Sequence, residues 1–183
     1  MRWLIVLIFS INLFANNVNN VRSIVKWDDK LVKEYKEDFK RYILTNNERM
    51  KYLKYVWRHA KEYDLGYTAL AIAWEESKFN LWCVNTITGD YGLMGINVKW
   101  YLVNKGIKAN YWQKKAIVTR LIRDDEMNLN YSLSELMIWR NKLGRNNWIK
   151  IWACYNGGSV PNYYYAKRIL NRIIVLKRYL KLK

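Results

Sequence analysis

The chain has 183 residues, enough for one domain with a hydrophobic core of its own and a short appendage. Lys and Arg (32) outnumber Asp and Glu (15), so the formal net charge of +17 favours anionic partners such as wall polymers, anionic lipid or nucleic acid. A single histidine, His59, and the absence of a CxxC pair or a nucleic-acid-binding motif argue against zinc and nucleic acid, and we expect no metal or cofactor.

The first residues have the pattern of an export signal. Arg2 supplies a positive start, residues 3–14 are apolar apart from Ser10 and Asn12, and Ala15 is a small residue that suits a cleavage site. This apolar run is shorter than the roughly 20 residues that a transmembrane helix needs. We therefore predict a signal peptide over residues 1–15 and an exported protein of the periplasm or cell wall, or a secreted one; an uncleaved anchor is the alternative.

Residues 16–45 are predicted to form a linker and an N-terminal helix. Residues 16–20 are polar and turn-prone. In residues 27–44, charged side chains alternate with an apolar stripe at helical spacing, formed by Leu31, Tyr35, Phe39, Tyr42 and Ile43. Such an amphipathic helix could pack on the domain, contact a partner or lie on a membrane.

The predicted catalytic domain spans residues 46–183 and begins with two helices. Asn46 and Asn47 are good cap residues for the first, which ends near Gly66. The second, over residues 67–79, is apolar almost all round, which is typical of a buried central helix.

Two acids, Glu75 and Glu76, stand at the end of this central helix. They point about 100° apart on a helix, and Glu76 is in phase with the apolar Ala69 and Ile72. A carboxylic acid at this position loses water, so its charged form is disfavoured and it can stay protonated near neutral pH, as a general acid must. This pattern indicates glycosidic bond cleavage.

The rest of the domain is predicted to be a loop followed by helices. Glycines punctuate residues 80–92, and helices are expected over 112–123, 126–143 and 148–155. Pro161 suits the start of a last helix, which is basic and amphipathic. Such a helix can bind membranes or acidic wall polymers, or simply dock on the core; its apolar stripe is Tyr165, Ile169, Ile173, Leu176 and Leu180.

Three segments in order along the chain carry a family resemblance: EESKFN from Glu75, TGDYGLMGIN from Thr88 and WACYNGGSV from Trp152. They resemble the signature segments of the lytic transglycosylases related to the soluble murein transglycosylases. The resemblance covers about residues 46–160. It implies a mainly α, lysozyme-like domain in which a buried central helix carries the catalytic glutamate, and a monomer that acts on peptidoglycan glycan strands.

The resemblance also implies roles for individual residues. Glu76, which precedes a serine, matches the catalytic acid that cleaves the MurNAc–GlcNAc bond and leaves 1,6-anhydro-MurNAc. Tyr155 would orient the glutamate or the substrate, Asn156 would brace the site and Met94 would form a groove wall. The full set expected at the substrate is Ser77, Met94, Asn97, Tyr155 and Asn156.

Departures from the family pattern keep other functions open. Gly95 stands where the family usually has Gln, which removes an amide expected to bind substrate, and Gly157 stands where Ala is usual. The Gly89-Asp90 pair is similar to goose-type lysozymes, so a hydrolase with Asp90 activating water is one alternative. A wall-binding protein without catalytic activity is another.

Two cysteines, Cys83 and Cys154, fall near the expected site. In an oxidising compartment they could form one disulfide, or they could remain two buried free thiols.

Overall fold

The computed structural model describes residues 28–180 and residue 182. These residues form a mainly α protein with one small sheet, which confirms the predicted fold class at that level. The predicted signal peptide and the polar linker at residues 16–20 lie outside the described residues. The helices are α2 (Asp29–Asp38), α3 (Asn47–Ala60), α4 (Gly66–Ser77), α5 (Val98–Asn104), α6 (Tyr111–Arg123), α7 (Asp125–Leu143), α8 (Trp148–Gly157) and α9 (Tyr163–Tyr179). Short π and 3-10 helices follow α2 and α3 at Phe39–Leu44 and Lys61–Tyr63.

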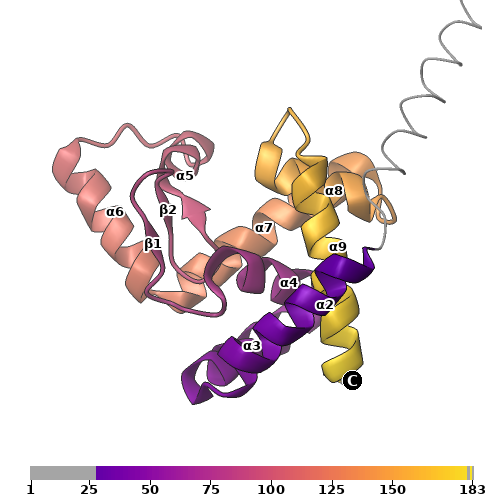
Figure 1. Ribbon diagram of the computed structural model, residues 1–183. Helices are drawn as coiled ribbons and strands as arrows, with labels where there is room; N and C mark the ends of the chain where they lie inside the picture. Colours follow the sequence, from indigo (N-terminus) through magenta and orange to yellow (C-terminus); the bar gives the residue numbers. More distant parts are fainter. Residues whose placement is uncertain (1–27, 181, 183) are drawn as a thin grey trace, which may run out of the picture.

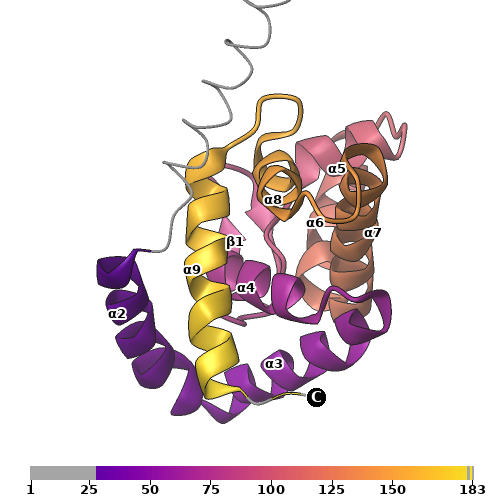
Figure 2. The ribbon, with the colours of Figure 1, turned by 90° about the vertical axis from the view of Figure 1, so that its right-hand side faces the viewer.

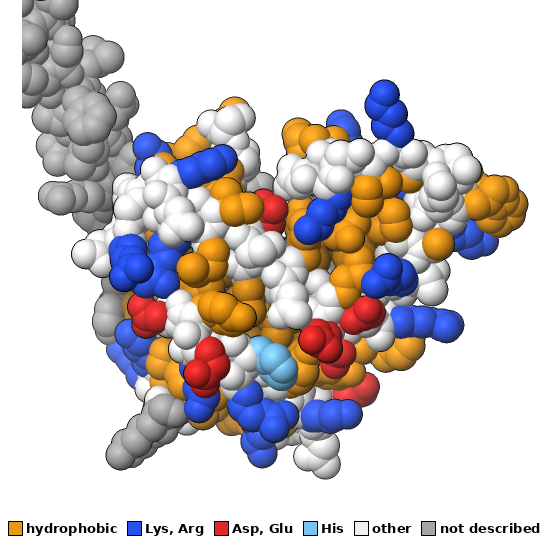
Figure 3. Space-filling model, turned by 180° about the vertical axis from the view of Figure 1, so that it is seen from behind, with side chains coloured by type: hydrophobic (Ala, Val, Ile, Leu, Met, Phe, Trp, Pro, Cys, Tyr) orange, Lys and Arg blue, Asp and Glu red, His pale blue; other side chains and the backbone are white. Residues whose placement is uncertain are grey.

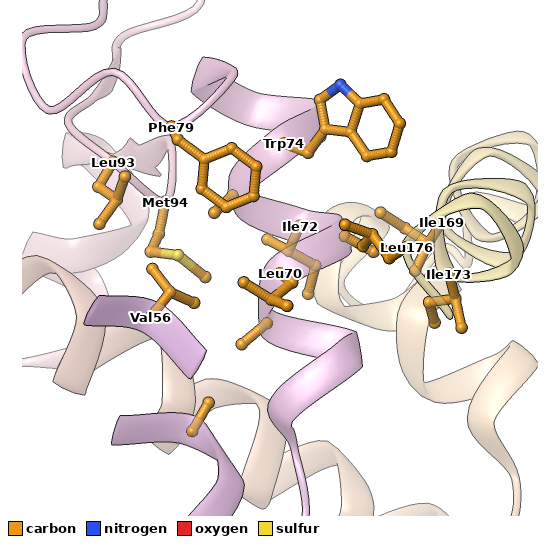
Figure 4. Close-up of a cluster of buried hydrophobic side chains, with 14 of the residues drawn as sticks. Val56, Leu70, Ile72, Trp74, Phe79, Leu93, Met94, Ile169, Ile173 and Leu176 are labelled. Atoms are coloured by element: carbon orange, nitrogen blue, oxygen red, sulfur yellow. The ribbon is translucent and has the colours of Figure 1, made fainter. Parts of the chain in front are cut away.

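Helix α4 is the centre of the fold. Nine of its residues are buried, and it packs chiefly against α9 and α3, so that other helices surround it in Figure 2. Figure 4 shows Ile72 between Ile169 and Ile173 of α9 on one side and Phe79 and Met94 on the other. A helix that is apolar all round can be stable only when it is covered in this way.

The end of α4 is set by two residues in the left-handed region. Lys78 (φ 53°) and Phe79 (φ 61°) turn the chain back on itself, and their amides reach the carbonyl of Ala73 or Trp74 in the last turn. Phe79 then inserts into the core with no exposed surface. The two glutamates in the last turn of α4 are therefore held by a rigid backbone.

The N-terminal helix packs on the domain, which is one of the three roles that its sequence left open. Val32, Tyr35, Phe39 and Ile43 are buried, and α2 lies beside α9. One member of the predicted stripe departs from expectation, because the chain changes to a π-helix at Phe39 and Tyr42 is left 41% exposed. Within the described residues, no helix has the length and apolar character needed to cross a membrane.

Two strands of the sheet lie in residues 80–92, which were predicted to be a loop, and its third strand follows that segment. Three strands of two residues each, β1 (Val84–Asn85), β2 (Asp90–Tyr91) and β3 (Ile96–Asn97), pair antiparallel in sequence order. In register, Asp90 faces Asn85 on one side and Asn97 on the other. The sheet, α5 and α6 form one lobe, and α8 with the start of α9 forms another (Figure 1). Figure 3 shows the surface hollowed between two lobes, with an acidic side chain at the base of the hollow.

Candidate active site

Glu76 lies in the last turn of α4 and is a partly exposed residue. Its Oε1 accepts a 2.7 Å hydrogen bond from the hydroxyl of Tyr165 on α9. Burial raises the pKa of Glu76 from 4.5 to about 7, with smaller upward contributions from the charges of Glu75 and Asp90, while the Tyr165 hydrogen bond and Arg168 act in the opposite direction. Near neutral pH this carboxyl is therefore present in both protonated and charged forms, as proton donation and acceptance require.

Glu75, the neighbouring acid, has a different environment. Its Oε1 accepts from Nε of Arg168 at 2.6 Å, and its Oε2 accepts from Nε of Arg172 at 2.7 Å. The 100° turn between adjacent helix positions explains why one acid meets two guanidinium groups and the other a neutral hydroxyl. Both oxygens of Glu75 are thus engaged by arginines of α9, so this side chain ties the end of α4 to α9.

The same ion-pair network reaches the N-terminal helix through Asp38. Its Oδ2 accepts from Nε1 of Trp74 and its Oδ1 from Nζ of Lys78, each at 2.9 Å. Arg172 completes the network, with its guanidinium 4.0 Å from the ring centroid of Tyr35 and 4.6 Å from that of Trp74. Helices α2, α4 and α9 are thus tied together beside the two glutamates.

Ser77 holds the site together instead of facing a groove. It is 6% exposed, and its hydroxyl lies 2.7 Å from the carbonyl of Leu93 and 3.0 Å from that of Ala73, while it accepts from the amide of Asn80. The sequence predicted Ser77 at the substrate, but in the structure its hydroxyl binds backbone carbonyls. Its bonds join the end of α4 to the segment before β3.

Gly95 is in direct contact with Glu76. A Cβ atom at position 95 would lie 2.7 Å from Oε2 and 2.8 Å from Cβ of Glu76, and the backbone φ is +59°. Both the close approach and the left-handed backbone favour glycine. The family usually has Gln at this position. In this structure Glu76 occupies the space that such a side chain would need.

Asn128 holds the loop that carries Met94 and Gly95 by hydrogen bonds to its backbone. The sequence did not predict this role. Asn128 is fully buried on α7, its Oδ1 accepts from the amide of Met94 at 2.8 Å, and its Nδ2 donates to the carbonyls of Tyr91 and Leu121. A polar residue on the core side of an otherwise apolar helix face is the signal that could have indicated it.

Met94 was expected to form a groove wall, and the structure does not place it there. Its side chain is fully buried and lies near Val56 and Phe79 in the core (Figure 4). The reason is the local backbone, because Asn128 binds the Met94 amide and directs the side chain inward. Met94 therefore supports the loop from the core and has no exposed surface for a substrate.

Tyr165, and not Tyr155, makes the direct contact with Glu76. The hydroxyl of Tyr155 pairs with that of Ser132, and the Tyr155 ring lies 6.4 Å from that of Tyr165 between centroids. Tyr165 belongs to the apolar stripe predicted for the last helix, and it is buried, but its hydroxyl reaches the carboxyl of Glu76. Its spacing to Arg168 and Arg172, three and then four residues, is the signal that places all three on one helix face.

Asn156 was predicted to brace the site, and it binds the cap residue of α9. Asn156 is exposed and accepts from Nδ2 of Asn162, which caps α9. Gly157 allows this approach, since a Cβ there would lie 2.8 Å from the amide of Asn162. Asn156 thus lies at the junction of α8 and α9.

Asp90 and Asn97 bind each other across the sheet. Nδ2 of Asn97 donates to Oδ1 of Asp90 at 2.8 Å, and the hydroxyl of Thr88 donates to the other carboxylate oxygen. The Asn97 oxygen caps α5 by accepting from the amides of Lys99 and Trp100. Both the nitrogen and the oxygen of the Asn97 amide therefore make hydrogen bonds within the protein. The position of Asp90 is fixed by the sheet.

Neither cysteine is in a disulfide: Cys154 is buried, and the thiol of Cys83 donates to the carbonyl of Glu76 at 3.6 Å. In the part of the chain that is described, no group of three or more acidic, His or Cys side chains is arranged to hold a metal. A pocket of about 240 Å³ between α2 and α9 is lined by other residues than those predicted for the site, namely Val32, Lys36, Val175, Arg178 and Tyr179.

Comparison with protein-family models gives a match. The family model described as "Transglycosylase SLT domain" matches residues 56–168, more than half of the chain. The matched range begins within α3 and ends within α9, so it includes Glu76, Gly95, Tyr155 and Tyr165, whereas α2 and Asp38 precede it. Among curated proteins and among solved structures nothing matches.

Proposed function

Because the chain belongs to the family of transglycosylase SLT domains, as its motifs indicated, we propose that it is a peptidoglycan lytic transglycosylase. The bond cleaved is the β-1,4 linkage from MurNAc to GlcNAc, and the product ends in 1,6-anhydro-MurNAc. The family implies a lysozyme-like fold, and the central position of α4 in the helical structure is consistent with it.

The observation that carries this proposal is the environment of Glu76. A carboxyl at the end of the central helix, with its pKa raised by burial to about 7 and a hydrogen bond from Tyr165, has the properties of a general acid that later acts as a base. Its neighbour Glu75 is occupied by two arginines. One carboxyl is therefore available for the chemistry at this point of the fold.

The proposed reaction needs only this one carboxyl. Protonated Glu76 gives its proton to the glycosidic oxygen while the bond from that oxygen to C1 of MurNAc breaks and an oxocarbenium-like centre develops at C1. The C6 hydroxyl of the same sugar then forms a bond to C1, and its proton passes to the Glu76 carboxylate. The acid is regenerated and no water is consumed. Tyr165 stabilises the intervening carboxylate by donating to it.

A hydrolase that uses Asp90 is the second candidate. The observation in its favour is that the charge of Asp90 contributes to the raised pKa of Glu76, so the two carboxyls interact. Against it, the oxygens of Asp90 accept hydrogen bonds from Thr88 and Asn97, which tie this carboxylate to its own sheet. We also propose that the enzyme is exported, because its substrate lies outside the cytoplasmic membrane.

The test is digestion of intact murein followed by mass spectrometry of the released muropeptides. We expect anhydro ends, one water lighter than the hydrolytic product, from the wild type and from Asp90→Asn, and no release by Glu76→Gln. Reducing ends as the main product, together with a severe Asp90→Asn defect, would support the hydrolase. No release by the folded wild type would leave a wall-binding protein without catalytic activity.

A further inference from the structure

The segment from Tyr91 to Arg123 contains no Asp or Glu, although the chain has 15 of them. It contains seven cationic residues: Lys99, Lys105, Lys108, Lys114, Lys115, Arg120 and Arg123. This segment builds α5, α6 and the connection between them. The lobe that it forms is therefore more strongly cationic than the chain as a whole and favours an anionic partner.

Large apolar side chains are exposed on the same lobe. Trp100, Val103 and Ile107 follow one another at spacings of three and four and are 59%, 59% and 40% exposed. Tyr111 and Trp112, at the start of α6, are 69% and 71% exposed. These residues do not serve the core, because α5 and α6 pack inward through other residues, Val98 and Leu121 among them.

The exposed residues gather at one end of the lobe. Figures 1 and 2 both place α5 and the start of α6 at the same outer end, and Figure 3 shows hydrophobic side chains there with Lys or Arg between them. We call this end the α5–α6 surface and define it by Trp100, Val103, Ile107, Tyr111 and Trp112 with Lys99, Lys105, Lys108, Lys114 and Lys115.

Cations and indole rings lie side by side on this surface. Nζ of Lys99 is 5.7 Å from the ring centroid of Trp100, and Nζ of Lys115 is 5.6 Å from that of Trp112. A protein at the surface of an anionic bilayer places its Trp and Tyr rings at the headgroup level and its lysines against the lipid phosphates. The α5–α6 surface presents both groups next to each other.

We propose that the α5–α6 surface binds the surface of an anionic lipid bilayer. A soluble polyanion would satisfy the lysines but offers no apolar phase to Val103, Ile107 and the indoles. A second copy of the same surface would bring like charges together. A bilayer of anionic lipid supplies both the negative charge and the apolar phase.

Membrane binding at this surface would also orient the catalytic site. Gly95 contacts Glu76, and β3 connects it directly to the first turn of α5. The segment between the acid and the membrane surface is short and hydrogen-bonded, through Asn97 at the cap of α5. The site would thus be held at a constant height and angle relative to the bilayer. This inference goes beyond the proposed function and can hold or fail without it.

The test uses the intact chain and vesicles of phosphatidylcholine with or without phosphatidylglycerol. We expect binding to the anionic vesicles that weakens as salt is added, and slower hydrogen exchange of residues 98–113 in the bound state. Exchange is measured because it reports the bound region and not binding alone. If the chain binds anionic vesicles without any change in residues 98–113, another segment is the anchor and the proposal is wrong.

Matched variants complete the experiment. Trp100→Ser with Trp112→Ser should weaken binding to the anionic vesicles by about tenfold. The control pair Tyr63→Ser with Tyr164→Ser, which are 51% and 70% exposed elsewhere, should leave it unchanged. Equal losses in both pairs, or equal binding to vesicles of phosphatidylcholine alone, would overturn the proposal.

A last arm separates lipid from glycan. Purified glycan strands replace the vesicles in the same exchange measurement, and we expect no protection of residues 98–113. Protection by glycan, with none by anionic vesicles, would mean that the aromatic side chains bind sugar and would refute the membrane assignment.

Discussion

The hydroxyl of Tyr165 donates to Oε1 of Glu76 at 2.7 Å across 89 positions of the chain. One and two turns further along α9, Arg168 and Arg172 bind the two oxygens of Glu75. A single face of α9 thus gives two adjacent glutamates opposite environments, a neutral donor for one and two cations for the other. This difference supports Glu76 as the proton donor more directly than the Glu-Ser motif does.

Tyr165→Phe should move the pH dependence of murein cleavage. The Tyr165 hydrogen bond lowers the pKa of Glu76, so its loss should raise that pKa above about 7. Because the acid must be protonated to act, the falling limb of kcat/KM should shift to higher pH, and kcat should also fall because the carboxylate loses its donor. Measurement of kcat/KM from pH 5 to 9 tests this.

Tyr155→Phe is the matched control for that experiment. Its hydroxyl pairs with Ser132, so its removal should leave the position of the falling limb nearly unchanged. A shift with Tyr155→Phe and none with Tyr165→Phe would restore the role that the family resemblance gave to Tyr155.

The raised pKa of Glu76 should also be visible in stability. A carboxyl whose pKa rises from 4.5 to about 7 on folding contributes fully below about pH 4.5, and this contribution is lost as pH rises through 7. Glu76→Gln does not titrate, so it should gain up to about 3 kcal/mol over the wild type between pH 4.5 and pH 8. Denaturant unfolding of both proteins across this range measures the difference. A constant difference at all pH values would mean that the pKa of Glu76 is not raised.

The longer helices could be predicted from the sequence because their signals are local. Residues 112–123 were expected to be helical and the structure has Tyr111–Arg123, since apolar spacing and the Asn110 cap act within a few residues. The strands could not be predicted, because two residues are too few to show a period of two. Helix α5 was missed for a similar reason, as seven residues with an exposed apolar face give no clear pattern.

The site was harder to predict than the helices. Glu76 could be chosen from a short motif, and its neighbours in sequence came with it. Tyr165 and Asn128 could not be assigned in the same way, because their roles depend on contacts with residues 89 and 34 positions away. Met94 was placed wrongly for the opposite reason, because a motif residue was assumed to face the substrate while its side chain packs inward.

Glu75→Gln should separate stability from catalysis. The substitution leaves Arg168 and Arg172 without their carboxylate, and since Arg168 is 41% exposed we expect a loss of about 2 kcal/mol, less than for a fully buried pair. Cleavage should persist in the folded protein. The falling limb of the pH profile should move to lower pH, because a negative charge near Glu76 is removed and two positive ones remain.

Unfolding curves and pH profiles of Glu75→Gln and Glu76→Gln, measured side by side, test this assignment. A folded Glu75→Gln protein with no activity, beside an active Glu76→Gln protein, would show that the two acids have been assigned in the wrong order.

Gly95→Ala should inactivate the enzyme through contact with Glu76, and Gly106→Ala is its matched control. Both glycines have positive φ, +59° and +64°, so alanine should cost each protein about 1 kcal/mol of stability through backbone strain. A Cβ at position 95 would also lie 2.7 Å from Oε2 of Glu76, whereas a Cβ at position 106 would meet no atom within 4 Å. Only Gly95→Ala should therefore displace the acid and lower the rate of murein cleavage, by about tenfold or more. A tenfold loss of rate corresponds to about 1.4 kcal/mol added to the activation free energy.

Gly95→Gln extends the same argument, since it introduces the residue that the family usually has at this position. In this backbone the longer side chain meets the same Glu76 carboxyl, so we expect activity at or below that of Gly95→Ala. Circular dichroism melting confirms that each variant is folded, and cleavage is measured below its melting temperature. Equal activity of Gly95→Ala and Gly106→Ala, or a gain of activity in Gly95→Gln, would mean that the loop can move away from Glu76 and that glycine is not required beside the acid.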